Sequence, residues 1–105
     1  MGLYERLMGL DVAPKIQVHQ FQATVGEFAR GRLTLAQAQA VIDTLSGAPL
    51  SASEITEAQT LLGTVTGSAT AKLARAKEID DVLLLAEELA PGYGTPALVK
   101  TRLGV

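Results

Sequence analysis

Residues 68–89 read SATAKLARAKEIDDVLLLAEEL and lie in the longest stretch of the chain without Gly or Pro. At 100° per residue, an apolar arc of about 160° is formed by Ile79, Val82, Leu83, Leu85, Ala86 and Leu89. One face of a helix is therefore apolar along this stretch. The pattern predicts a long amphipathic helix from about residue 68 to residue 89, with that face in the core.

The opposite face of this helix is acidic but contains one leucine. Leu84 falls outside the apolar arc, among Asp80, Asp81, Glu87 and Glu88. An apolar side chain next to a broad core stripe widens the apolar surface of a helix, and exposed apolar patches mark interaction sites. These five residues are therefore predicted to contact a partner.

The order of charged residues along the same helix is opposite to the order that its dipole favours. Its basic residues (Lys72, Arg75, Lys77) come early and its acidic residues come late. A helix dipole favours the reverse order. Two interpretations stay open: the helix breaks near residues 76–78, or its acidic end meets a basic partner.

Two shorter helices are predicted upstream by a shared start signal. Thr34 is followed three residues later by Gln37, and Ser51 by Glu54. This is the capping box, in which the hydroxyl and the Gln or Glu side chain each accept from a backbone N–H at the helix start. Helices are expected from about 34 to 46 and from about 51 to 65, as a helical hairpin over residues 34–65.

A further helix is predicted over about 14–30, with Pro14 as its first residue. Val18, Phe21, Val25 and Phe28 form an apolar stripe, and Gly31 is a natural stop. Ile16 and Val18 alternate with polar residues, so an extended start is the alternative.

Both ends of the chain also read as helix. Leu3, Leu7 and Leu10 share one side of a helix over residues 2–10, while Thr95 and Pro96 begin a last helix that ends before Gly104. The fold class is therefore all-α: one compact domain, residues 1–105, of five or six short helices. Residues 1–13 are a candidate N-terminal docking arm.

Composition excludes several classes of function. The 9 Lys and Arg are scattered and the net charge is −2, so no nucleic-acid partner is expected. No apolar run approaches the roughly 20 residues that cross a bilayer, so no membrane partner is expected either. Ala and Leu dominate and only 4% of residues are aromatic. A core of this kind buries little area per residue, which favours stabilisation by docking.

No catalytic constellation can be assembled from the sequence. His19 is the sole histidine, with no nucleophile motif to accompany it, and is best interpreted as a structural or solvent-facing residue. The acidic residues of 78–88 lack calcium-loop or HExxH spacing and read as a solvated helix face. No enzyme activity, metal, cofactor or small-molecule substrate is therefore expected.

Several segments together resemble a known class of protein. They are Tyr4-Glu5-Arg6-Leu7, residues 14–21, residues 27–31 leading into Thr34 and Gln37, residues 50–54, residues 81–87 and residues 102–105. They resemble small helical virion proteins of tailed bacteriophages. The resemblance implies a non-enzymatic subunit, assembled in the host cytoplasm and present in many copies on the particle. The implied partners are other virion proteins or further copies of the chain.

The resemblance leaves the place in the particle open between capsid, connector and tail or fibre. The alternative is a small cytosolic interaction or regulatory domain that grips a partner helix with the hairpin of residues 34–65.

Overall fold

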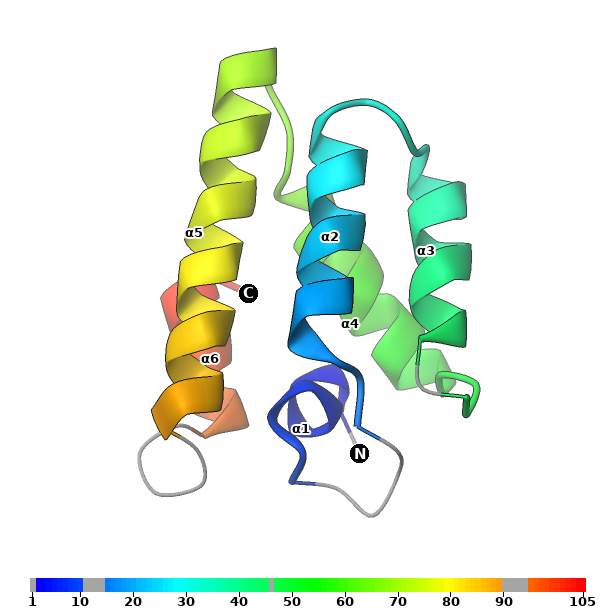
Figure 1. Ribbon diagram of the computed structural model, residues 1–105, viewed down its shortest axis with the longest axis vertical. Helices are drawn as coiled ribbons and strands as arrows, with labels where there is room; N and C mark the ends of the chain where they lie inside the picture. Colours follow the sequence, from blue (N-terminus) through cyan, green and yellow to red (C-terminus); the bar gives the residue numbers. More distant parts are fainter. Residues whose placement is uncertain (1, 11–14, 46, 90–94) are drawn as a thin grey trace.

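The computed structural model describes residues 2–10, 15–45, 47–89 and 95–105, and this part of the chain folds into six helices (Figure 1). They are α1 (Leu3–Met8), α2 (Val18–Ala29), α3 (Leu35–Thr44), α4 (Ala52–Gly63), α5 (Ala69–Leu89) and α6 (Pro96–Leu103). No strand occurs among the described residues. The prediction of an all-α bundle of short helices is confirmed.

The helices pack around α2 and α5. These two run antiparallel and side by side, α3 lies against the other side of α2, and α4 and α6 lie behind them in Figure 1. The short helix α1 contacts α4, α5 and α6. Helices α3 and α4 also contact each other, so the predicted helical hairpin of residues 34–65 is present.

Side-chain caps set the starts of four helices. The Thr34 hydroxyl accepts from the backbone N–H of Gln37 at 3.1 Å, and the Gln37 side chain accepts from the backbone N–H of Thr34 at 2.9 Å. Ser51 and Glu54 repeat this arrangement at 3.2 and 2.9 Å. Both predicted capping boxes are confirmed. Hydroxyls of Ser68 and Thr95 accept in the same way at the starts of α5 and α6.

Helix α2 begins at Val18, later than the start near residue 14 that the sequence predicted. Gln17 is extended, and the N–H of Ile16 donates to the carbonyl of Arg6 at 3.2 Å, which ties this segment to α1. The extended alternative is therefore right, and a helical start near residue 14 is wrong for the described residues 15–17. Pro14 itself lies outside the described residues. The predicted stripe is confirmed, with Val18, Phe21 and Val25 buried and Phe28 packed partly against the core.

Helix α5 is continuous, so of the two interpretations of its charge order the break near residues 76–78 is wrong. Its buried side chains are Ala76, Ile79, Leu83 and Ala86, an arc of only about 80° at 100° per residue. Val82 packs partly against the core. Leu85, at the edge of the predicted arc, is 39% exposed, because the covered face of α5 is narrower and centred nearer Ile79. The Leu89 side chain lies outside the described part.

Helix α1 contributes directly to the core. Leu3, Tyr4 and Leu7 are almost completely buried. Leu10, expected on the same side, is 45% exposed because the helix ends at Gly9, which has a φ of 71°. The N–H of Leu10 then donates to the carbonyl of Glu5 at 2.9 Å, outside the helical period. Residues 3–8 of the expected N-terminal arm thus pack within this chain.

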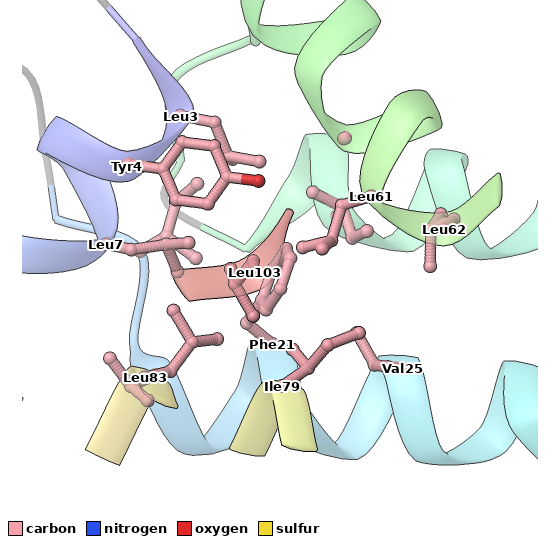
Figure 2. Packing of buried hydrophobic residues seen from close by; sticks show 14 of the residues in the cluster. Leu3, Tyr4, Leu7, Phe21, Val25, Leu61, Leu62, Ile79, Leu83 and Leu103 are labelled. Carbon is pink, nitrogen blue, oxygen red and sulfur yellow. The ribbon is translucent and has the colours of Figure 1, made fainter. Parts of the chain in front are cut away.

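The apolar core draws on all six helices. Figure 2 shows Tyr4 and Leu7 of α1 facing Phe21 of α2, Leu61 of α4 and Leu103 of α6. Ile79 and Leu83 of α5 complete this cluster on the α2 side. Of the aromatic residues, Tyr4 and Phe21 lie at the centre, whereas Tyr93 lies outside the described residues. The core is therefore built mainly from aliphatic side chains around two rings.

One buried ion pair crosses the fold and was not predicted. Arg6 and Glu54 are 1% and 4% exposed. The Arg6 Nη1 donates to both carboxylate oxygens of Glu54 at 3.4 Å, and its Nη2 donates to the Ala48 carbonyl at 3.2 Å. Since Glu54 also completes the cap of α4, this pair fixes α1 against the start of α4.

Candidate interaction site

A groove of about 650 Å³ lies between α2 and α5. The wall from α2 consists of His19, Gln22, Ala23, Gly26 and Arg30. The wall from α5 consists of Leu73, Ala76, Lys77, Asp80, Asp81 and Leu84. Both sets follow the spacing of three and four residues that places side chains on one helix face. The groove therefore runs along two antiparallel helix faces beside their mutual packing seam.

Small side chains form part of its lining. Ala23, Gly26 and Ala76 have little or no side chain, which leaves room above the seam. The two walls are joined by the Gln22 side-chain amide, which donates to the backbone carbonyl of Asp80 at 3.0 Å. A Cβ at Gly26 would lie 2.8 Å from Arg30 Nη1, so the Arg30 guanidinium lies across this glycine. The absence of a side chain at Gly26 thus gives Arg30 its position in the groove.

Charges of both signs occupy the middle of the α5 wall. Lys77 Nζ lies 3.2 Å from Asp81 Oδ1, and both side chains are exposed. Asp80 is partly buried, and burial raises the pKa of its carboxyl above the ordinary value. The nearby Asp81 adds to this rise in pKa, while Lys77 and Arg30 oppose it. Its Oδ1 is buried and has no hydrogen-bond partner among the described residues.

The α5 wall has a leucine at each end. Leu73 and Leu84 are each 44% exposed. They are eleven residues apart, which is about three helical turns and roughly 16 Å on the same face. The groove thus presents apolar ends and a charged centre, an arrangement suited to another helix surface.

Three of the five predicted contact residues lie together in this groove: Asp80, Asp81 and Leu84. Glu88 is exposed but lies outside the lining, and the Glu87 side chain lies outside the described part. His19 is exposed and lines the groove, in agreement with a solvent-facing residue.

The α2 wall was missed by sequence reasoning. It could have been found from the spacing of His19, Gln22, Ala23, Gly26 and Arg30, which form a second stripe beside the core stripe of the same helix. The sequence does not show that this stripe of α2 lies beside the stripe of α5, which comes some fifty residues later in the chain.

A second cavity, of about 180 Å³, lies near the chain end. It is lined by Tyr4, Thr56, Glu57, Thr60, Lys100 and Val105. Glu57 accepts from the Leu3 backbone N–H at 3.3 Å and lies 3.8 Å from Lys100 Nζ. The Tyr4 hydroxyl is buried and has no partner among the described residues. Burial and the nearby Glu57 carboxylate both raise the pKa of this phenol.

The described part of the chain holds no group of three or more His, Asp or Glu side chains placed to bind a metal ion. None of its helices is long and apolar enough to span a membrane.

Comparison with known proteins adds no family. The chain matches no family model, no curated protein and no solved structure.

Proposed function

We propose that this protein is a non-enzymatic structural subunit of a tailed-bacteriophage virion, and that it joins the assembly through the α2–α5 groove. The observation that supports docking is the groove itself, with Leu73 and Leu84 exposed at its ends and charged side chains between them. Solvent-exposed leucines that border a concave surface are stabilised by a partner that covers them. The virion context comes from the resemblance of the sequence segments.

The second candidate function is a small cytosolic interaction or regulatory domain that uses the hairpin of α3 and α4. The exposed side chains of Leu35 and Val41 on α3 favour it, at 44% and 36% exposure. The α2–α5 groove is the stronger candidate surface, since it combines exposed leucines with a concave shape.

Mass spectrometry of purified particles separates these functions. Particles are banded on a density gradient, treated with protease to remove adhering host protein, and digested after disruption. The proposal expects peptides of this chain in a constant ratio to a major capsid protein across gradient fractions. A chain found only in the soluble fraction of infected cells would contradict the virion role and favour the regulatory domain.

A further inference from the structure

We propose that the α2–α5 groove is filled by the same face of a second copy of this chain, giving a two-fold symmetric, antiparallel four-helix bundle. This inference builds on the docking surface in the proposed function and names its occupant. Four-helix bundles commonly pack neighbouring helices antiparallel, as α2 and α5 already do within one chain. Two such pairs placed face to face complete the bundle.

The groove positions of α5 are spaced symmetrically along the helix, with leucines at the two ends, opposite charges at the centre, and Ala76 facing the second copy's Asp81. Positions 73, 76, 77, 80, 81 and 84 are symmetric about the point between Glu78 and Ile79. An antiparallel copy therefore places Leu73 against the second copy's Leu84, and Lys77 against the second copy's Asp80. The two-fold axis repeats both contacts, so apolar ends meet apolar ends and each cation meets a carboxylate.

The α2 stripe has a matching symmetry. Its positions 19, 23, 26 and 30 are symmetric about the point between Thr24 and Val25, so Ala23 meets the second copy's Gly26. The hydrogen bond from Gln22 to Asp80 fixes how the two helices are aligned. With that alignment, the centres of the two stripes differ by about one residue, roughly 1.5 Å along the axis. A single two-fold axis can therefore serve both helices.

The contacts also bring a cation to a carboxylate. Asp80 is partly buried; its Oδ1 is closed off from outside, and its other carboxylate oxygen is the acceptor for the second copy's Lys77 ammonium. Lys77 gives up its pairing with Asp81, but that pair is solvent-exposed and contributes little. The leucines at the two ends lose exposed apolar area at the same time.

Self-complementarity is the reason to choose a second copy over an unrelated helix. An isologous interface needs a surface that matches itself after a two-fold rotation. A groove that binds a different protein needs no such symmetry. Here the leucines, the Lys77–Asp80 charges and the small residues Ala23 and Gly26 obey it, whereas Ala76 faces the second copy's Asp81 and His19 faces its Arg30.

A charge-swap experiment tests the pairing. Lys77→Asp places two carboxylates opposite each other in the dimer, and Asp80→Lys places two ammonium groups opposite each other. Each variant alone is expected to weaken dimerisation at least about tenfold. Mixed in equal amounts, the two variants restore both attractive pairs in a heterodimer. Sedimentation equilibrium measures the mass in solution, which is 11.0 kDa for the monomer and twice that for the dimer.

Circular dichroism confirms that each variant is folded. If Asp80→Lys does not fold, Lys77→Asp alone tests the pairing, because the Lys77 side chain is 77% exposed and its reversed charge still faces the second copy's Asp80. A dimeric wild type, monomeric single variants and a dimeric mixture support the inference. The inference would be overturned by a wild type that stays monomeric at high concentration. It would also be overturned if both charge-reversed variants dimerised as strongly as the wild type.

These outcomes are separate from those for the proposed function. A monomer that still enters particles keeps the virion role and transfers the groove to a different subunit. A charge-dependent dimer that is missing from particles keeps the pairing and rejects the virion role.

Discussion

At the scale of single residues, the buried Arg6–Glu54 pair links α1 to the start of α4. Glu54 accepts from the backbone N–H of Ser51 as a cap and also receives the Arg6 guanidinium. Burying an ion pair is costly in itself, but removing one partner leaves the other charge uncompensated. The pair therefore specifies how α1 sits on α4 rather than adding large net stability.

Removing one partner of this pair is expected to destabilise the protein strongly. We predict that Arg6→Ala lowers the free energy of unfolding by about 3–5 kcal/mol. Urea denaturation followed by circular dichroism measures the loss. The matched control is Lys77→Ala in the exposed pair with Asp81, where the change stays within about 0.5 kcal/mol. The double variant Arg6→Met with Glu54→Gln is expected to recover most of the stability, since no charge is then left buried. Equal losses of stability in Arg6→Ala and Lys77→Ala would contradict this explanation.

Tyr4 provides a pH-dependent prediction. Burial raises the pKa of the phenol, so the folded protein favours the neutral form. The stability contributed by this preference is complete below the unfolded pKa of about 10 and is lost as the pH rises above it. Tyr4→Phe is expected to remove this alkaline decline and, by deleting an unpartnered hydroxyl, to raise stability at neutral pH by about 1 kcal/mol.

Denaturation midpoints across the alkaline range measure the effect of Tyr4→Phe. The control is Tyr93→Phe, which replaces the other tyrosine of the chain. An alkaline decline that persists unchanged in Tyr4→Phe would show that another group causes it.

At the scale of helices, the start signals were the most predictable feature. Thr34, Ser51 and Thr95 act within one turn of their own sequence, so their roles can be read without knowing the fold. The width of a buried face cannot be read in this way. Leu85 lies in the apolar arc of α5 yet is exposed, because coverage depends on where α2 and α6 lie.

Gly26 in the interior of α2 yields a prediction for this scale. Gly26→Ala is expected to raise stability by about 0.5–1 kcal/mol through helix propensity. It also weakens dimerisation, because the new Cβ displaces the Arg30 guanidinium and fills part of the groove. Gly63→Ala in α4 is the matched control, since nothing lies within 4 Å of its Cβ position.

Thermal unfolding and sedimentation equilibrium report the two effects of the glycine variants separately. The expected pattern is that both variants are at least as stable as the wild type and that only Gly26→Ala loses dimer. Equal dimerisation in the two variants would argue against the groove as the contact surface.

At the scale of the whole molecule, the all-α class followed from patterns that extend along the chain, but the groove did not. Asp80, Asp81 and Leu84 could be chosen because one helix showed an apolar residue in an acidic face. Their partners on α2 depend on tertiary packing, which brings together stripes separated by about fifty residues. The Arg6–Glu54 pair escaped prediction for the same reason, since 48 residues separate its partners.

We propose that the α2–α5 face incorporates this chain into a virion, and two aspartate variants test this proposal. Leu84→Asp places a charge in the groove, whereas Leu35→Asp places the same charge on α3, and both leucines are 44% exposed. Both variants are expected to keep wild-type helix content by circular dichroism, since neither side chain belongs to the core. The decisive measurement is the amount of each variant per particle, by quantitative mass spectrometry of particles grown with that variant as the sole copy. The account predicts at least about a tenfold loss for Leu84→Asp and no loss for Leu35→Asp; equal incorporation of both variants would contradict it.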